Sequence, residues 1–379
     1  MKSDKGSVVI LRSNPIAPDP RVEKEAISLS NNGYEVSILC WDRENKFPSV
    51  EEKEFGTIYR LQIPAKFGTG IKNITHLIRW QFGLLKWLCK NRKSYYLIHA
   101  CDFDTVIPAL VCKLFFKKRV IYDIFDFYAD MLRNVPNTLK KVIRFIDLKL
   151  INHVDAVILA DESRIIQIKG SQPKRVIVVY NAPRNDFDCK NNISNKSKSL
   201  TVGYIGLLQK ERGIFEMINV ISKHEEWKLV IGGFGSDEEY VKSMCTRLKN
   251  AEFVGRVPYD ETLKIYCGSD VLFATYDPRI PNHRYSSANK LFEAMMLGKP
   301  IIVAKNTGMD NLVKKYNLGY VVDYGDEYQL ENALSEIYNW SSEKRLDFAK
   351  RVKDVYLKEF SWANMEKRLL NLYGELNKK

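Results

Sequence analysis

A lysine and a glutamate stand one helical turn apart in the segment YSSANKLFEAMMLGKPII, residues 285–302. Lys290 and Glu293 would point the same way from one face of a helix. This helix is predicted to end at Gly298, before an apolar strand at 301–303. A lysine can neutralise phosphate and a glutamate can accept hydrogen bonds from a ribose diol, so the pair suits a nucleotide diphosphate sugar. An exposed ion pair on an amphipathic helix is the structural alternative.

A second segment, GLLQKERG at 206–213, could also hold phosphate. A strand is predicted to end at Gly206, the following loop carries Lys210 and Arg212, and a helix begins near Gly213. Free N–H groups and the positive dipole end at a helix N-terminus favour an anion, and the Arg212 guanidinium adds a bidentate donor. An ordinary strand–helix turn with solvated charges is the alternative.

Two further strand ends could approach a ligand through their backbone. Gly233 belongs to IGGFG at 231–235, where glycines permit tight turns or close contact. Val254 belongs to FVGRVP at 253–258, whose amides could hydrogen-bond a nucleobase. Purely structural turns are the alternative, and they are the favoured interpretation for the glycine cluster at 231–235. The sequence contains neither GxGxxG after a strand nor GxxxxGK[ST], which disfavours a nicotinamide dehydrogenase and a P-loop ATPase.

Parallel sheets are expected to position these segments, because short β-branched runs alternate with helical patterns. We predict an α/β fold of two Rossmann-like domains facing across a cleft, with ligands at the carboxyl ends of the strands. The expected parts are a first Rossmann-like domain at 1–185, a polar linker at 186–199, a second Rossmann-like domain at 200–358 and a helix at 359–379 that packs back on the first domain. The predicted strands are 8–11, 36–41, 57–61, 97–100, 120–124, 156–159 and 176–180, then 201–205, 228–231, 252–254, 271–274, 301–304 and 319–322.

The chain resembles the retaining glycosyltransferases of family 4, glycosyl transferases group 1, which have the GT-B fold. The matching motifs occur in family order: GxLxxxRG at 206–213, the GGFG turn, FVGRVP at 253–258 and NKLFEAMMLGKPII at 289–302. DPRVEKEA at 19–26 and GYEV at 33–36 resemble the family's opening unit. The resemblance implies that Arg212 and Lys290 hold the donor diphosphate and stabilise the leaving group, that Glu293 binds the ribose hydroxyls, and that Gly206 lies near the diphosphate. It also implies that the first domain binds the acceptor and the second binds the nucleotide sugar.

The sequence departs from the family pattern at three positions. Tyr285 stands where the family often has a second glutamate, Leu207 replaces an arginine, and Arg212 replaces a lysine. We therefore expect the phosphate charge to rest on Arg212, Lys290 and Lys210, and the donor sugar stays open. The complete predicted binding set is Gly206, Lys210, Arg212, Gly213, Gly233, Val254, Lys290 and Glu293.

Two carboxylates of the first domain are further catalytic candidates beside Arg212, Lys290 and Glu293. Cys101 stands where the family often has a histidine, and 123–126 replaces a frequent Asp-x-His-Glu. Asp102 and Asp126 could then orient an acceptor hydroxyl, with turn or core-edge roles as the alternative. His99 is expected to be structural. The DxD triplets at 102–104 and 186–188 lack the setting of a metal site, so we expect no metal and no cofactor besides the donor substrate.

The chain carries a net charge of +13, concentrated in its first half. Residues 71–93 are predicted to form a helix on which Lys72, Arg79, Lys86 and Lys93 recur every seven residues, with Trp80 and Trp87 beside them. Cations flanked by tryptophan suit an anionic membrane surface. A solvated basic face with the tryptophans packed inward is the alternative. The absence of a nucleic-acid-binding motif disfavours nucleic acid.

Cysteine spacing and hydropathy indicate the compartment. The seven cysteines show no CxxC motif, which favours free thiols in a reducing cytoplasm. No apolar run reaches 18 residues, so no membrane span is expected. A cytoplasmic protein, peripheral at the inner face of the cell membrane, is predicted.

The motifs together with the resemblance to family 4 imply a hexosyl-type glycosyltransferase that transfers a sugar from a nucleotide diphosphate sugar with retention of configuration. A lipid-linked glycan or cell-surface polysaccharide intermediate is the expected acceptor. A nucleotide-sugar epimerase of the same fold is one alternative. A nucleotide-sugar or nucleic-acid binding module without catalysis is the other, and Tyr285 and Cys101 keep it open.

Overall fold

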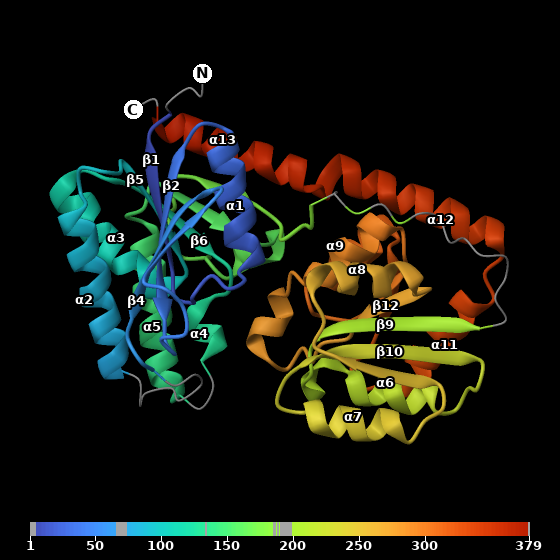
Figure 1. Ribbon diagram of the computed structural model, residues 1–379. Coiled ribbons are helices and arrows are strands. Elements are labelled where there is room, and N and C mark those ends of the chain that lie inside the picture. Colours follow the sequence, from blue (N-terminus) through green and yellow to red (C-terminus); the bar gives the residue numbers. More distant parts are fainter. Residues whose placement is uncertain are drawn as a thin grey trace. The chain divides into compact units, whose positions relative to one another are not determined.

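The structure is a computed structural model that describes residues 5–65, 74–132, 135–184, 187, 189 and 199–377 (Figure 1). The chain divides into two compact units, Met1–Tyr180 with Met365–Lys379, and Asn181–Asn364. Each unit contains one largely parallel sheet. This confirms the predicted α/β class with two Rossmann-like parts.

The sheet of the first unit has the strand order β3-β4-β2-β1-β5-β6-β7-β8. All of the predicted strands are present, and the pairs are parallel except for the β3–β4 hairpin. β3 was not predicted, because its sequence VEEK is polar and mostly exposed at the sheet edge. The strands are β1 (Ser7–Arg12), β2 (Glu35–Asp42), β3 (Val50–Lys53), β4 (Gly56–Gln62), β5 (Leu97–Cys101), β6 (Arg119–Ile124), β7 (Ala156–Leu159) and β8 (Val176–Val178).

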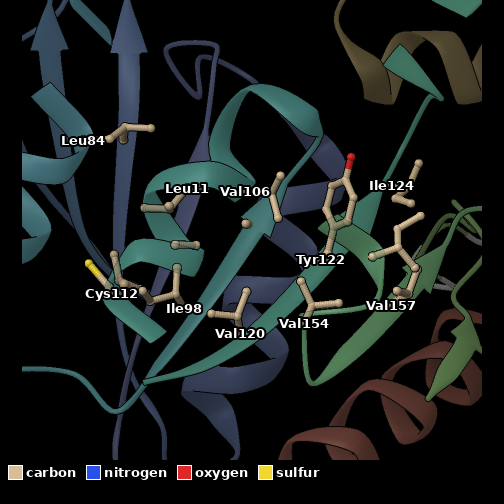
Figure 2. Packing of buried hydrophobic residues seen from close by; sticks show 14 of the residues in the cluster. Leu11, Leu84, Ile98, Val106, Cys112, Val120, Tyr122, Ile124, Val154 and Val157 are labelled. Carbon is tan, nitrogen blue, oxygen red and sulfur yellow. The ribbon is translucent and has the colours of Figure 1, made fainter. Parts of the chain in front are cut away.

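Helices cover this sheet and close its core. Figure 2 shows Cys112 of the helical layer beside Ile98 of a strand. Leu84 and Val120 belong to the same cluster, and all four residues are fully buried. The C-terminal helix belongs to this unit from Met365 onward. The helices are α1 (Pro20–Asn31), α2 (Ile74–Lys90), α3 (Phe103–Phe116), α4 (Tyr128–Met131), α5 (Asn137–Ile151) and α13 (Trp362–Asn377).

The tryptophans of α2 pack inward, as the alternative interpretation of this helix expected. Trp80 is fully buried and its Nε1 donates a hydrogen bond to the Asp104 carbonyl oxygen at 3.1 Å. Trp87 packs on the ring of Tyr59, with 5.1 Å between the ring centroids. Arg79 and Lys86 are exposed, whereas Lys72 lies outside the described residues.

A buried polar network joins α1, β5, β6 and α13 in the first unit. Two nitrogens of the Arg21 guanidinium lie 3.0 and 3.3 Å from the Asp123 carboxylate, and the His99 Nε2 lies 3.3 Å from the same carboxylate. The His99 Nδ1 is 2.7 Å from the hydroxyl of Tyr373 on α13. Glu25, fully buried, lies 3.3 Å from the Arg21 Nε. His99 is therefore structural, as expected from its place at the end of a strand.

The network is expected to make the stability of the first unit fall as the pH rises toward neutrality. Burial, together with the neighbouring Asp123 carboxylate, raises the pKa of Glu25 from 4.5 to about 7. The folded state then holds this proton between those two values while the unfolded chain releases it, so the free energy of unfolding decreases across that window. Calorimetry from pH 4.5 to 7.5 should show this slope flattened in Glu25→Gln and unchanged in the exposed control Glu54→Gln. Equal slopes in both variants would refute the assignment.

The sheet of the second unit is entirely parallel, in the order β11-β10-β9-β12-β13-β14. The strand order reverses between β9 and β12, and in such sheets ligands bind at the carboxyl ends beside this reversal. The strands are β9 (Leu200–Leu207), β10 (Trp227–Phe234), β11 (Ala251–Gly255), β12 (Val271–Ala274), β13 (Ile301–Ala304) and β14 (Gly319–Val322). The helices are α6 (Ile214–Ile221), α7 (Glu238–Thr246), α8 (Tyr259–Gly268), α9 (Asn289–Leu297), α10 (Met309–Tyr316), α11 (Glu327–Tyr338) and α12 (Ser342–Val355).

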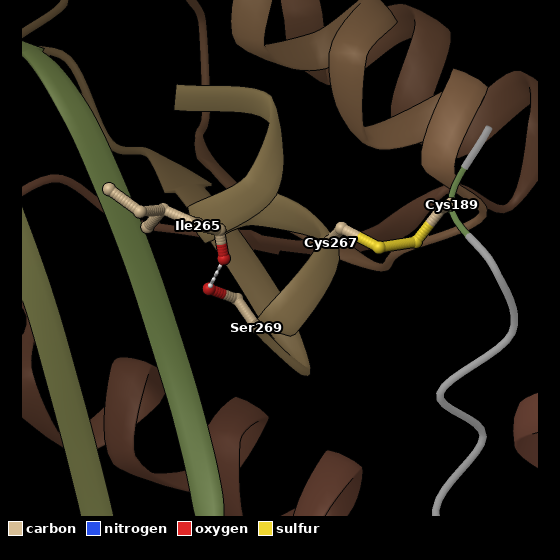
Figure 3. Close-up of a disulfide and its surroundings, with 4 residues drawn as sticks. All are labelled: Cys189, Ile265, Cys267 and Ser269. Atoms are coloured by element: carbon tan, nitrogen blue, oxygen red, sulfur yellow. Dashed lines mark hydrogen bonds between the residues drawn. A yellow bond between two sulfur atoms is a disulfide. The ribbon is translucent and has the colours of Figure 1, made fainter. Parts of the chain in front are cut away.

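The expectation that every cysteine is a free thiol is wrong for one pair. Cys189 and Cys267 form a disulfide between the segment before β9 and the end of α8 (Figure 3), with 5.9 Å between their Cα atoms. The two residues are 78 positions apart, so their spacing carried no signal of the pairing. The other five cysteines are free.

The helices in the described part of the chain include none that is long and apolar enough to cross a membrane.

Candidate active site

Lys290 lies at the point where the sheet of the second unit reverses its order. It is the second residue of α9 and only 6% exposed. Its Nζ donates a hydrogen bond to the Ile205 carbonyl oxygen at 2.8 Å and lies 3.9 Å from the centroid of the Tyr204 ring. The same Nζ would be 3.3 Å from a Cβ on Gly206. Helix α9 therefore carries a buried cation to the carboxyl end of β9.

The environment of Lys290 weakens its hold on the proton. Burial lowers the pKa of Lys290 to about 8, and the Arg212 cation acts in the same direction, while Glu293 opposes both. The ammonium is therefore still mostly charged at neutral pH, but it has lost much of its hydration. An anionic ligand at this position would replace that lost hydration, which makes Lys290 suited to a phosphate group.

Glu293 lies one turn further along α9 and is 4% exposed. The Tyr259 hydroxyl hydrogen-bonds the Glu293 carboxylate, and burial together with this carboxylate raises the pKa of Tyr259. Because both Lys290 and Glu293 are buried, the alternative of an exposed ion pair on an amphipathic helix is wrong. A buried carboxylate that accepts hydrogen bonds matches the recognition of ligand hydroxyl groups.

The N-terminus of α9 adds donors to the same place. Its N-cap residue, Ala288, gives no side-chain cap to the first turn of this nine-residue helix. The buried Ser287 Oγ, just before the helix, has no hydrogen-bond partner among the described residues. Uncapped N–H groups and the positive end of the helix dipole favour an anion. This helix end and the Lys290 ammonium can thus act on the same ligand.

Two predicted glycines allow the backbone to pack tightly around this position. Gly233 has φ +128°, and a Cβ on it would lie 1.7 Å from the Gly206 carbonyl oxygen. Gly213 has φ +68°, and a Cβ on it would lie 2.1 Å from the Thr275 Oγ1. Glycine is required at both positions for steric and conformational reasons. The ends of β9, β10 and β12 can therefore converge.

Arg212 lies in a short 3₁₀ turn, Lys210–Arg212, directly after β9. Its guanidinium stacks over the Tyr276 ring at 4.1 Å from the centroid. The buried Nε makes no hydrogen bond within the part of the chain that the structure describes. The Arg212 charge lowers the pKa of Lys290, so the two cations lie close enough to influence each other.

Two members of the predicted binding set lie apart from this group. Lys210 is exposed and lines a pocket of about 600 Å³ together with Asp277, Arg279 and Tyr324, and neither Lys290 nor Glu293 contributes to that pocket. Val254, on β11, packs against Gly232 of β10. The structure therefore brings together Gly206, Arg212, Gly213, Gly233, Lys290 and Glu293, and it leaves Lys210 and Val254 at the periphery.

The carboxylates of the first unit, Asp102 and Asp126, are neighbours. The Phe125 and Asp126 amides donate to the Asp102 Oδ1 at 3.0 and 3.4 Å, and Arg12 forms an ion pair with its Oδ2. Burial raises the pKa of Asp102 to about 7 against the effect of Arg12. Asp126 accepts a hydrogen bond from Arg164 at 2.7 Å. Both oxygens of the Asp102 carboxylate thus interact with other protein groups, whereas the Asp126 carboxylate is the more exposed of the two.

The DxD triplets at 102–104 and 186–188 are expected to hold no metal. Asp104 is buried in the first turn of α3, and Asp186 and Asp188 lie outside the described residues. Within the described ranges, one group of potential ligand atoms lies close enough to hold an ion, formed by Glu25, His99 and Asp123. Arg21 supplies a positive charge to that group, so the network is neutralised from within.

Sequence reasoning missed the aromatic residues that support the cations. Tyr204, Tyr266 and Tyr276 come from different elements and surround Lys290 and Arg212. The Tyr266 hydroxyl donates to the Ile205 carbonyl oxygen at 2.8 Å and accepts from the Ile205 amide at 3.0 Å. It thereby fixes the backbone oxygen that also holds Lys290. These tyrosines share no motif, so no pattern in the sequence identified them.

Comparisons with known proteins show which family and fold this chain resembles. Residues 186–355 match the family model for glycosyl transferases group 1, which confirms the predicted resemblance to that group. A glycogen synthase of Thermodesulfovibrio yellowstonii is 23% identical over 257 residues, covering 65% of this chain and 47% of the relative. The chain spans about half the length of the first curated relatives that it matches.

Solved structures of similar fold cover nearly the whole chain. Sucrose-phosphate synthase from Thermosynechococcus elongatus superposes with a TM-score of 0.78 at 14% identity, covering 98% of this chain and 99% of that one. Anabaena HepE in complex with UDP gives a TM-score of 0.70 at 14% identity, covering 97% of this chain and 100% of that one. The fold is therefore GT-B, as predicted.

Proposed function

We propose that this protein is a glycosyltransferase that transfers a sugar from a nucleotide diphosphate donor bound in the second unit. The buried Lys290 ammonium at the carboxyl end of β9, beside the uncapped N-terminus of α9, is the observation that carries the proposal. Breaking the bond between sugar and diphosphate leaves negative charge on a phosphate oxygen. Lys290 and Arg212 would stabilise that charge in place, which is where preorganised cations lower a barrier. The complex of a similar fold with UDP supports the donor class.

The same arrangement supports a transfer that needs no metal ion. Two cations and a helix N-terminus supply positive charge where other enzymes use a divalent ion. Retention is the outcome that the resemblance to family 4 implies. In this proposal Glu293 accepts hydrogen bonds from the ribose diol, and Gly206 and Gly233 let the diphosphate approach the backbone.

We assign binding of the acceptor to the first unit. The proposed acceptor is a lipid-linked glycan or a polysaccharide intermediate, and the proposed transferred sugar is a hexose. Asp126 is the more accessible carboxylate that could orient the acceptor hydroxyl. We further propose a cytoplasmic location at the inner face of a membrane; the exposed basic side chains of α2 support the peripheral attachment.

The donor assignment is tested by replacing Glu293. Loss of hydrogen bonds to a charged group should weaken binding of the cognate nucleotide sugar about 10- to 100-fold. Thermal shift with UDP, GDP, ADP and their sugars identifies that donor, because ligand at 100 times its Kd stabilises by about 2.7 kcal/mol. Calorimetric titration then compares Glu293→Gln with Glu343→Gln, an exposed control on α12. Equal donor affinity in the two variants would remove Glu293 from the site.

Product analysis distinguishes transfer from epimerisation. A transferase should release nucleoside diphosphate only when an acceptor is present, and the anomeric configuration of the product can be read by NMR. Conversion of the donor sugar without any acceptor would overturn the proposal in favour of the epimerase. Donor binding without turnover, with lipid-linked and polysaccharide acceptors supplied, would favour a binding module.

A further inference from the structure

Three neighbouring helices of the first unit expose apolar side chains to solvent. Helix α3 contacts both α2 and α5, and the three can be followed in Figure 1. One residue of each shows the extent of exposure: Phe82 of α2 is 68% exposed, Leu114 of α3 is 76% exposed and Phe145 of α5 is 61% exposed. The full exposed apolar set, here named the three-helix face, is Ile74, Ile78, Phe82, Ile107, Leu114, Phe115, Leu139, Val142, Phe145 and Ile146.

The exposed apolar residues repeat at helical spacing, so on each helix they line up along one side and are not scattered singly over the surface. Ile74, Ile78 and Phe82 are four residues apart on α2 and lie on one side of the helix. Ile107 and Leu114 are seven residues apart on α3, and Phe115 follows directly. Exposed apolar patches of this kind on a protein surface mark an interaction site.

The charges on the same helices have one sign. Three basic residues lie in α2, one in α3 and four in α5. The acidic residues of these helices are Asp104 and Asp147, and both are buried. Arg79, Lys86, Lys90, Lys141 and Lys149 are exposed. The three-helix face therefore offers solvent apolar groups and cations, without an exposed carboxylate in its helices.

We propose that the three-helix face docks on an anionic lipid bilayer. Apolar side chains can enter the boundary between headgroups and acyl chains, while cations beside them pair with lipid phosphates. Charge complementarity favours an anionic bilayer over the other possible partners of this face. A second copy of the face would bring like charges together, and nucleic acid would leave the aliphatic stripes exposed to water. The cations that would meet the lipid phosphates include Arg79, Lys86 and Lys141. The apolar contacts with the bilayer would come from all three helices, and not from the inward-packed Trp80 and Trp87.

Vesicle sedimentation tests the electrostatic part. The full chain should bind vesicles of phosphatidylglycerol mixed equally with phosphatidylcholine, and phosphatidylcholine vesicles much less. The triple variant Arg79→Glu, Lys86→Glu, Lys141→Glu should lose about 100-fold in partition coefficient, because each cation near an anionic surface contributes several-fold. Salt near 1 M, where the screening length is about 3 Å, should release the wild type to a similar degree.

A matched control separates this surface from net charge alone. Lys242→Glu, Lys249→Glu and Lys350→Glu change the net charge equally at exposed positions of the second unit. This variant should retain wild-type binding within about threefold, since its cations lie outside the face. Equal losses in the two triple variants would overturn the proposal.

A second pair of variants tests the apolar part. Phe82→Gln, Leu114→Gln and Phe145→Gln together should lower the partition coefficient at least about tenfold. Val50→Gln, Tyr328→Gln and Leu357→Gln replace exposed apolar residues elsewhere and should leave it unchanged. Unfolding temperatures close to that of the wild type establish that each variant is folded.

Three further results would overturn the proposal. These are unchanged binding in both face variants, equal binding to neutral and anionic vesicles, and a dimer in light scattering that both face variants dissociate. The last result would assign the face to a second copy of this chain. Lipid binding is measured without a donor or acceptor, so its outcome is independent of the proposed transfer.

Discussion

Replacing Lys290 with methionine is expected to lower kcat/KM for sugar transfer about 100- to 1000-fold, the usual effect of removing one preorganised charge-stabilising donor. Methionine has a similar shape but carries no charge, so the helix position and the packing on Tyr204 are kept. The measurement is nucleoside diphosphate release with the cognate donor and acceptor. Lys305→Met, an exposed lysine after β13, is the matched control and should retain wild-type activity.

The titration of Lys290 gives the same experiment a second readout. Its pKa is lowered to about 8, so donor affinity should decline as the pH rises through that value and the ammonium is lost. Lys290→Arg keeps a permanent charge, and its donor affinity should stay level over that range. A wild-type decline that persists in Lys290→Arg would assign the titration to another group.

The stability of the Lys290→Met variant distinguishes catalytic from structural loss. The folded protein releases the Lys290 proton at a lower pH than the unfolded chain, whose lysine pKa is 10.5. The contribution of Lys290 to the free energy of unfolding therefore rises between about pH 8 and 10.5. At neutral pH, below this window, the buried cation destabilises the fold. The variant should unfold at the same temperature as the wild type or higher. Marked destabilisation together with lost activity would indicate a structural role instead.

Local pattern was sufficient to predict most of the fold. Strands such as β7 and β12 are short β-branched or apolar runs bounded by polar residues, and their predicted limits match the structure. β3 shows where this signal fails, because an exposed edge strand of sequence VEEK buries too little to need an apolar pattern. Sequence separation hid the Cys189–Cys267 disulfide for a different reason, since pairing over such a distance depends on the tertiary fold.

In the candidate site, too, some features follow from local sequence and others depend on the tertiary fold. Lys290 and Glu293 share one helix, so their common direction follows from helical geometry alone. The burial of both residues, the contact of Lys290 with Ile205 and the support from Tyr266 depend on how α9 meets the end of β9. Lys210 illustrates the limit most clearly. It stands two residues before Arg212, yet its side chain lines another pocket.

Replacing Gly233 with alanine is expected to destabilise the second unit by about 4 kcal/mol or more, which is exceptional for one methyl group. The backbone at φ +128° suits glycine alone, and the strain for another residue is about 1–3 kcal/mol. The added Cβ would also lie 1.7 Å from the Gly206 carbonyl oxygen. That overlap can be relieved only by separating the ends of β9 and β10, which are paired there.

The matched control for Gly233→Ala is Gly268→Ala. Gly268 ends α8, and a Cβ there meets nothing within 4 Å, so this variant should be as stable as the wild type. Calorimetry should show a loss of roughly 10 °C or more in the unfolding temperature for Gly233→Ala, since 1 kcal/mol corresponds to about 2–4 °C in a domain of this size. Equal unfolding temperatures in the two variants would mean that β9 and β10 can separate without cost. The close approach of Gly233 to Gly206, which shapes the site beside Lys290, would then not be a constraint of the fold.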